Sequence, residues 1–359
     1  MENKYSVINH QQSKEAEKLG HLTADWLKLI YENCWFKLFV PKELSGLGFT
    51  LPQVLEIEEK LASKDGSLAW TVTLCAGAAW FVGFLDKNLA EEIFASPKVC
   101  FSGSGFIGGK ADLINGKFHI NGSWTYASGA LHATHFTANC EVLENGKAIF
   151  DKKGEKLIKA FILKKEEVEI LDGWSYMGMV ATGSHAFKID KLLVPQNRSF
   201  EILPHKTTLS NPVFKYPFLQ LAETTLVANV LGISIHFIKL VGECFEERNK
   251  LRNYDVKHLD YFKELGFNQE KKIANAKNTF YNTVNQSWEE LIKNNIISNE
   301  TLNKVSQVSR ALAHVCRKAT SKLHPFAGLE AAKNHTEINR VWRDMNTVSQ
   351  HTLLIFPFG

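Results

Sequence analysis

Residues 101–133 read FSGSGFIGGKADLINGKFHINGSWTYASGALHA, and this stretch decides the fold class. It holds two turn pairs, Asn115-Gly116 and Asn121-Gly122, between runs of β-prone residues. Asn-Gly is a strong signal for a hairpin turn, because both residues tolerate positive φ. Short strands joined by tight turns, with no helix between them, predict an antiparallel sheet or barrel.

The same stretch contains a glycine pattern like that of a nucleotide-binding loop. Residues 103–108, GSGFIG, match G-x-G-x-x-G, which binds a dinucleotide only where a helix begins within the motif. Residues 109–124 instead continue as a hairpin pattern, so we expect no helix there. We interpret the glycines as part of a strand whose small residues let a flat ligand or a neighbouring strand come close.

Helical patterns flank this β-region on both sides. Residues 10–95 carry apolar side chains at helical spacing. After the β-region, three long helical segments are predicted at about 219–249, 268–294 and 299–322, and a fourth begins near Thr336. Long helices joined by short polar loops predict an antiparallel bundle.

These patterns predict an α+β protein with three domains. An N-terminal helical domain covers residues 1–97, a middle antiparallel β-domain of barrel or sandwich type covers 98–205, and an antiparallel four-helix bundle covers 206–359. The length of 359 residues agrees with this division, since a domain averages roughly 150 residues.

Composition excludes several classes of protein. A net charge of +4 is too mild for a nucleic-acid binder, in which a clustered basic stripe is expected. The six cysteines are scattered, with no C-x-x-C pair, so we expect neither a metal site nor a disulfide framework. The N-terminus lacks the apolar core of a signal peptide, and the apolar stretch at 68–85 falls short of a membrane span. We expect a cytoplasmic protein that does not bind a membrane.

Four stretches, taken in order, resemble the acyl-CoA dehydrogenase superfamily. They lie at residues 40–70, 101–133, 174–195 and 337–351. The second carries W-x-Y-A-S-G-x-x-H-A, which is most similar to the two-component flavin-dependent monooxygenase branch, and the fourth carries the family's R-D … H pattern. The resemblance implies the fold predicted above, called acyl-CoA dehydrogenase-like, with a flavin held between the β-domain and the bundle.

The resemblance also implies which residues of the β-domain contact the flavin. Trp124, Tyr126 and Ser128 lie at period two on one predicted strand, so we expect them to share a face. An aromatic side chain there would shield the ring and Ser128 would hydrogen-bond its N5 edge, although an ordinary core strand is the alternative. Three residues are expected at the pyrimidine edge: Ser102, Gly103 and Ser104. Three more candidates lie downstream: Trp174, Thr182 and Ser184.

Two residues of the bundle are candidates for the phosphate end of the flavin. Arg248 falls where the family has an Arg that contacts the flavin diphosphate across a subunit interface, and a guanidinium suits phosphate. Gly328 stands near the family's glycine-rich turn. The Phe-Gly that follows the family's Arg is missing here, and Arg248 is equally well explained as a cation at a helix C-terminus. FAD and FMN therefore both stay open.

His351 separates the possible activities. Aligned on Arg343 and Asp344, which we expect to be an ion pair that orients the last helix, the catalytic Glu of acyl-CoA dehydrogenases would fall at Thr352. A hydroxyl is far too weak a base for that role. The neighbouring His351 titrates near neutrality and can act as acid, base or donor toward a substrate, although an exposed terminal His is the alternative.

The preferred hypothesis is a flavin-dependent oxidoreductase of the monooxygenase type. It would use oxygen and a flavin reduced by a separate reductase on an aromatic or heterocyclic small molecule, with Ser128 and His351 as catalytic residues. An acyl-CoA dehydrogenase with Glu223 as an unusual base, and a flavin-poor oligomeric homologue without catalysis, are the alternatives. We also expect a homotetramer, because the apolar periodicity over 219–240 is wider than one buried face needs.

Overall fold

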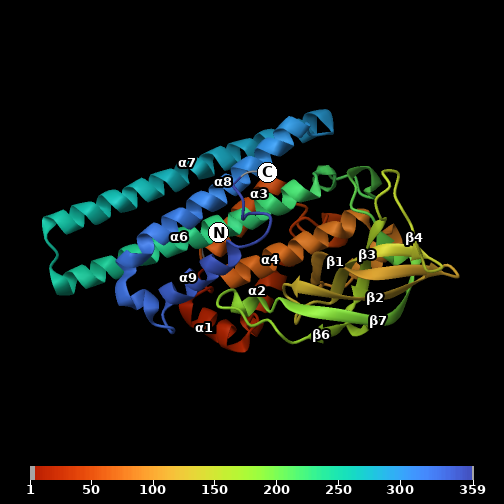
Figure 1. Cartoon of the computed structure of the whole chain (residues 1–359), viewed down its shortest axis with the longest axis horizontal. Helices are drawn as coiled ribbons and strands as arrows, with labels where there is room; N and C mark the ends of the chain where they lie inside the picture. The colour runs from red at the N-terminus through yellow and green to blue at the C-terminus, as the bar shows by residue number, and fades with distance from the viewer. Residues whose placement is uncertain (1–4, 358–359) are drawn as a thin grey trace.

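The computed structural model describes residues 5–357, in which helices precede and follow a β-region (Figure 1). The first helices are α1 (His10–Leu19), α2 (Ala24–Glu32), α3 (Leu51–Ala62), α4 (Gly66–Ala79) and α5 (Lys87–Phe94). The strands are β1 (Phe101–Ile114), β2 (Lys117–Ala127), β3 (His135–Glu144), β4 (Lys147–Ala148), β5 (Ile158–Lys164), β6 (Glu169–Leu171), β7 (His185–Pro195) and β8 (Ser199–Phe200). The last helices are α6 (Phe218–Arg252), α7 (Val256–Asn294), α8 (Asn299–Leu323) and α9 (Glu337–Val348).

The predicted α+β class is confirmed. The domain boundaries stay a prediction, and they fall between α5 and β1 and between β8 and α6.

The two Asn-Gly pairs play different roles in the sheet. Asn115 and Gly116 both have positive φ and form the β1–β2 hairpin turn, as predicted. Asn121 and Gly122 instead lie within β2, so the prediction of a turn there is wrong. A Cβ atom on Gly122 would lie 2.5 Å from the Cα of Gly109, which is its partner on β1. Glycine at 122 therefore serves close strand approach, not a turn.

The sheet is mixed rather than purely antiparallel. Its eight strands follow the order β6-β7-β2-β1-β3-β5-β8, with β4 paired to β3. The predicted antiparallel pairing holds for β1–β2, β2–β7 and β3–β5, whereas β1 and β3 run parallel. The parallel pair arises because the chain, after leaving β2, crosses in residues 128–134 to the other side of β1.

The C-terminal bundle contains two very long helices, α6 with 35 residues and α7 with 39. Helix α7 begins twelve residues before the predicted 268, because Asn253 ends α6 in a left-handed conformation and Asp255 caps α7 at the His258 N–H. Figure 1 shows α6, α7 and α8 side by side. The shorter α9 packs on α6.

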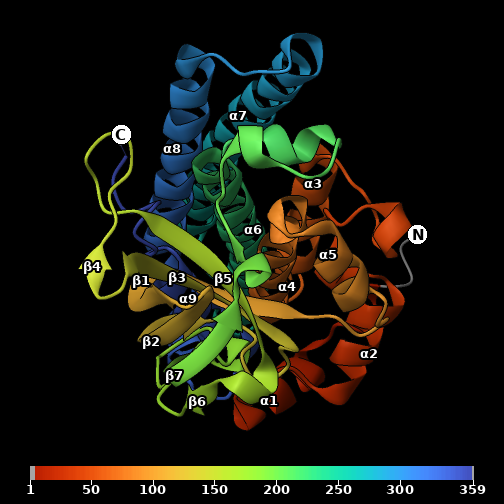
Figure 2. The ribbon, with the colours of Figure 1, turned by 90° about the vertical axis from the view of Figure 1, so that its right-hand side faces the viewer.

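Helix α4 lies between the bundle and the sheet and contacts α6, β1 and α9 (Figures 1 and 2). Almost all its residues are buried, as expected for a helix that is apolar on every side. Gly66–Phe84 and Phe218–Arg252 are apolar and long enough to cross a membrane, but their apolar windows are 89% and 78% buried inside the protein. They are core elements of this fold.

Candidate active site

Four hydroxyl side chains meet where the end of β2 lies against the loop before β7. The Oγ of Ser128 lies 2.8 Å from the Oγ of Ser184, which lies 2.7 Å from the Oγ1 of Thr182. Ser102 joins from β1, since its hydroxyl donates to the backbone oxygen of Ser128 at 2.8 Å. All four residues are buried. We call Ser102, Ser128, Thr182 and Ser184 the hydroxyl cluster.

The direction of donation in the hydroxyl cluster follows from its far end. Thr182 donates its hydroxyl proton to the backbone oxygen of Met179 at 2.8 Å, so it must accept from Ser184. Ser184 then has no proton left for Ser128 and accepts from it. The Ser128 Oγ therefore presents only lone pairs to a ligand, and it favours a ligand with an N–H or O–H group.

Three aromatic side chains lie beside the hydroxyl cluster. The Tyr176 hydroxyl donates to the Tyr126 hydroxyl at 3.3 Å, and Trp174 stacks on Tyr176 with ring centroids 4.1 Å apart. The indole of Trp174 donates to the same Met179 oxygen that accepts from Thr182. Tyr126 is 59% exposed and Tyr176 is 45% exposed. We call Tyr126, Trp174 and Tyr176 the aromatic cluster, which is partly open and in which the Tyr126 ring stands at 90° to Trp174 and at 63° to Tyr176.

Trp124 does not share a face with Tyr126 and Ser128, so that prediction is wrong. The side chain of Trp124 is fully buried and stacks on Phe187, with centroids 5.1 Å apart. The pairing of β2 with β7 shifts register just beyond Trp124, and Tyr126 adopts a φ of +64°. This irregularity breaks the alternation of side chains along the strand. Trp124 therefore belongs to the interior of the sheet, as the core-strand alternative holds, whereas Tyr126 faces outward.

The glycine-rich stretch is a strand, as the context argument predicted. β1 runs through it, and no helix follows before β2. A Cβ atom on Gly103 would lie 1.9 Å from the Oγ1 of Thr137 on β3, so glycine allows the two strands to approach. The Oγ of Ser104 accepts from the Phe106 N–H at 3.2 Å. Of these three neighbours at the start of β1, Ser102 is the one that joins the hydroxyl cluster.

His351 lies just after α9 and packs against Trp70 of α4, with ring centroids 5.9 Å apart. It is partly buried, so the alternative of an exposed terminal His is wrong. The Leu353 N–H donates to its Nδ1 at 3.3 Å, which leaves the ring proton on Nε2. Burial lowers the pKa of His351 below its ordinary value of 6.5. At pH 7 the ring of His351 is therefore mostly neutral, and it donates through Nε2.

Helix α4 connects His351 with the hydroxyl cluster. Trp70 contacts His351, and five residues further on the Sγ of Cys75 lies 3.7 Å from the backbone oxygen of Ser128. Five residues correspond to about 7.5 Å of helix rise. The same rigid helix therefore sets the spacing between His351 and Ser128.

Arg248 and Gly328 meet at the far end of the bundle. Gly328 has a φ of +65°, and a Cβ atom there would lie 1.8 Å from the Nη1 of Arg248. The Nη2 of Arg248 donates to the Phe326 oxygen at 2.6 Å, while its buried Nε has no hydrogen-bond partner among residues 5–357. Figure 1 shows this end of α6 opposite the sheet. The structure brings the two phosphate candidates together, but far from the hydroxyl cluster of the same chain.

Arg343 and Asp344 do not pair with each other, so that prediction is wrong. Successive helical residues point about 100° apart. Arg343 pairs with Glu17 of α1, and Asp344 accepts from the Met179 N–H at 2.5 Å. Asp344 also lies 3.6 Å from Arg340, whose other partner is Asp65 at 2.7 Å. Arg343 also donates to the backbone oxygen of Met177, so both residues hold α9 against the segment 177–179, and Arg343 in addition holds it against α1.

We expect Asp344 to make the protein less stable as pH rises. Burial raises the pKa of Asp344 to about 7, from 3.8 in the unfolded chain, and Arg340 opposes this rise only in part. Because the folded state binds this proton more tightly, the stabilising contribution is present below about pH 4 and is lost as pH rises through 7. Asp344→Asn, which mimics the protonated carboxyl, should flatten the decline in the free energy of unfolding measured with urea between pH 5 and pH 7.5. The control Asp190→Asn, at an exposed strand position, should follow the wild type, and a parallel decline in Asp344→Asn would contradict the prediction.

The two positions considered for a carboxylate base do not supply one. Glu223 is fully buried inside the bundle, and its Oε1 accepts from the Nη2 of Arg310 at 2.7 Å and from the Nε at 3.0 Å. Thr352 is exposed and carries a hydroxyl. Glu223 is therefore held in an ion pair between α6 and α8.

The sequence of this chain is similar to one family model and to several proteins named as monooxygenases. The model of the family described as "Acyl-CoA dehydrogenase, C-terminal domain" matches residues 225–356. The indole-3-acetate monooxygenase of Acinetobacter baumannii is 25% identical over 350 residues, covering 95% of this chain and 86% of the relative. The oxygenase subunit HsaA of a flavin-dependent monooxygenase from Mycobacterium tuberculosis is 24% identical over 367 residues, covering 95% and 87%.

Solved structures share the same fold. The HsaA monooxygenase from M. tuberculosis superposes with a TM-score of 0.89 at 22% identity, covering 98% of this chain and 93% of that one. XiaF from Streptomyces sp., solved in complex with FADH2 and glycerol, superposes with a TM-score of 0.86 at 18% identity, covering 98% and 90%.

Proposed function

Because this chain belongs to the acyl-CoA dehydrogenase superfamily as a flavin-dependent enzyme, we propose that it is the oxygenase component of a two-component monooxygenase. The comparisons confirm the predicted resemblance to this superfamily and to its flavin-dependent monooxygenases. The relatives that cover most of this chain carry the names of monooxygenases and hydroxylases. A component of this kind takes its reduced flavin from a separate reductase.

The observation that carries the proposal is the direction of donation in the hydroxyl cluster. The Ser128 Oγ can only accept a hydrogen bond from a ligand. A reduced flavin carries a proton on N5 and an oxidised flavin does not, so an acceptor at this edge suits the reduced form. The aromatic cluster next to Ser128 is partly exposed, so its rings can pack against the flavin ring. When bound, reduced flavin supplies the oxygen-activating chemistry.

The role of His351 in this proposal is to hold the substrate. Its Nε2–H donates at neutral pH, so it favours a substrate with an oxygen or a ring heteroatom that accepts a hydrogen bond. The relatives' names include indole-3-acetate monooxygenase and p-hydroxyphenylacetate 3-hydroxylase. We propose an aromatic or heterocyclic small molecule as the substrate class. The dehydrogenase alternative is not supported, since Glu223 is held by Arg310.

We expect the protein to hydroxylate in the presence of reduced flavin and oxygen, and to leave acyl-CoA untouched. The protein is mixed anaerobically with reduced FMN or FAD and one of two probes, indole-3-acetate or p-hydroxyphenylacetate, and oxygen is then added. Mass spectrometry should find a product with one added oxygen atom, and reduced flavin without protein is the control. Anaerobic bleaching of the bound flavin by an acyl-CoA, followed by absorbance, would overturn the monooxygenase proposal.

We further propose that the protein acts as a homotetramer in the cytoplasm. Helix α4 places Cys75 against Ser128 and is hydrogen-bonded through Thr73 to Asn229 of α6, and Arg248 lies 19 residues beyond Asn229, about 28 Å along the helix axis. Its phosphate site is thus too far from the hydroxyl cluster of the same chain to serve one flavin, which favours a site shared between subunits. Apolar residues are exposed at that end, with Leu251 at 87% and Leu329 at 83%. The six free thiols agree with a reducing compartment.

The tetramer is tested by light scattering. We expect a mass of about four chains at micromolar concentration, and a smaller mass for the double variant Leu251→Asp/Leu329→Asp, because burying a carboxylate in an apolar interface is costly. Leu193→Asp, at an exposed position on β7, is the control and should keep the wild-type mass. A monomeric wild type would contradict the proposal.

A further inference from the structure

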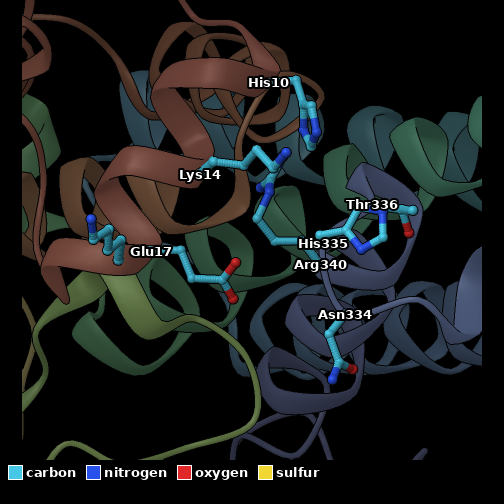
Figure 3. Close-up of a pocket in the computed structure, with 8 residues that line it drawn as sticks. His10, Lys14, Glu17, Asn334, His335, Thr336 and Arg340 are labelled. Carbon is cyan, nitrogen blue, oxygen red and sulfur yellow. The ribbon is translucent and has the colours of Figure 1, made fainter.

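A cavity of about 230 Å³ lies between α1 and the start of α9, and no member of the hydroxyl cluster lines it (Figure 3). One wall is a single face of α1. The opposite wall is formed by the residues just before α9 and by Arg340 within α9. The cavity thus separates two elements that are far apart in the sequence, and nothing in the proposed monooxygenase reaction uses it.

The α1 wall carries a net positive charge, since Lys14 and Lys18 line the cavity together with a single carboxylate, Glu17. Lys14 and Lys18 are four residues apart, so they lie on the same helix face and repel each other. Neither lysine pairs with a carboxylate within residues 5–357. The acidic residues nearby have other partners, since Glu17 pairs with Arg343, and Glu337 lies 3.2 Å from His236.

Arg340 adds buried donors that lack partners. Its side chain is only 5% exposed, and its Nη1 is held by Asp65. Its Nε and Nη2 are buried and make no hydrogen bond to any residue that the structure describes. The Glu337 carboxylate oxygen lies 3.8 Å from Nη2, which is too far for a hydrogen bond, and Asp344 lies 3.6 Å from Nη1. Buried N–H groups without partners are rare, and a bound ion or water is one of the usual reasons for them.

We propose that this cavity binds a small tetrahedral oxyanion of the phosphate class. Two ammonium groups and the free edge of a guanidinium are donors that suit such an anion. Asn334 and His335 bring further polar groups from the opposite wall. A water occupies about 30 Å³ in the liquid, so the cavity has room for an ion together with a few waters. The bound anion joins α1 to α9, and this site does not depend on the proposed reaction.

The test compares the wild type with two double variants. Lys14→Ala/Lys18→Ala removes the lysines of the cavity, and the matched control Lys152→Ala/Lys153→Ala removes two exposed lysines between β4 and β5. Thermal denaturation is followed against phosphate concentration at constant ionic strength, with chloride as the reference. We expect a saturable rise in Tm for the wild type and the control, and calorimetry should show phosphate affinity at least about tenfold weaker in Lys14→Ala/Lys18→Ala, because charge-assisted hydrogen bonds are lost.

Further ligands test whether the cavity selects tetrahedral oxyanions and whether it is separate from the flavin site. Sulfate should act like phosphate and acetate should not. FMN affinity should be unchanged in Lys14→Ala/Lys18→Ala. The proposal is overturned by an absent Tm rise in the wild type, by an equal rise in all three proteins, by an equal effect of acetate, or by a parallel loss of FMN binding, which would assign the lysines to the flavin phosphate.

Discussion

Replacing His351 with Ala is expected to lower hydroxylation by about 10²–10³-fold, the typical effect of removing one hydrogen-bond donor from an active site. The bound reduced flavin should still react with oxygen, because the proposed role of His351 is to hold the substrate and not the flavin. The reaction then yields peroxide in place of hydroxylated product. Product formation and oxygen consumption, measured together, separate the two outcomes.

His351→Gln provides a sharper version of this experiment. The Gln amide can donate a hydrogen bond but cannot act as an acid or base near neutrality. Because burial keeps His351 neutral at pH 7, we expect the Gln variant to retain more activity than the Ala variant. His205→Ala, at an exposed position, is the control. Equal hydroxylation by wild type and His351→Ala would remove His351 from the site.

Trp124→Ala is expected to reduce the free energy of unfolding by about 3–5 kcal/mol, the usual cost of deleting a fully buried Trp or Phe side chain. The indole stacks on Phe187 and donates to the Asn139 oxygen at 2.9 Å. It also packs so closely on Gly109 that a Cβ there would lie 2.4 Å from the ring. Urea denaturation measures the loss.

Tyr126→Ala is the matched variant, on the same strand but facing outward. It should cost little stability, because the Tyr126 side chain is 59% exposed. It should instead weaken flavin affinity, measured by titration with reduced flavin under anaerobic conditions. The prediction would be contradicted if Trp124→Ala stayed stable but lost flavin affinity while Tyr126→Ala kept it. The flavin would then contact Trp124 and not Tyr126.

The sequence predicts best what short-range physics decides. The Asn115-Gly116 turn follows from two adjacent residues, and the helical segments follow from their periodicity. The direction of Tyr126 could not be predicted, because a local irregularity in β2 breaks the period on which the argument rested. The prediction of a turn at Asn121-Gly122 also failed for a reason outside the local sequence. The need for glycine at 122 comes from Gly109 on the neighbouring strand.

The candidate site depends on contacts between distant parts of the chain. The resemblance named Ser128, Thr182 and Ser184 separately, but the hydrogen bond between Ser128 and Ser184 spans 56 positions. The pairing of Arg340 with Asp65 spans 275 positions. No periodicity or motif in the sequence predicts such pairings. The pairing of Glu223 with Arg310 could not be predicted either, because it depends on the packing of α6 against α8.

The last hydrogen-bond acceptor of the hydroxyl cluster is a backbone carbonyl, that of Met179. Side-chain mutation cannot delete a backbone oxygen, so the final acceptor of the hydroxyl cluster survives a substitution at Met179 itself. The backbone N–H of the same Met179 donates a hydrogen bond to Asp344 on α9. Preference for one redox state of the cofactor would thus depend on how the C-terminal helix docks, as well as on the Ser184 and Thr182 hydroxyls that link Ser128 to Met179.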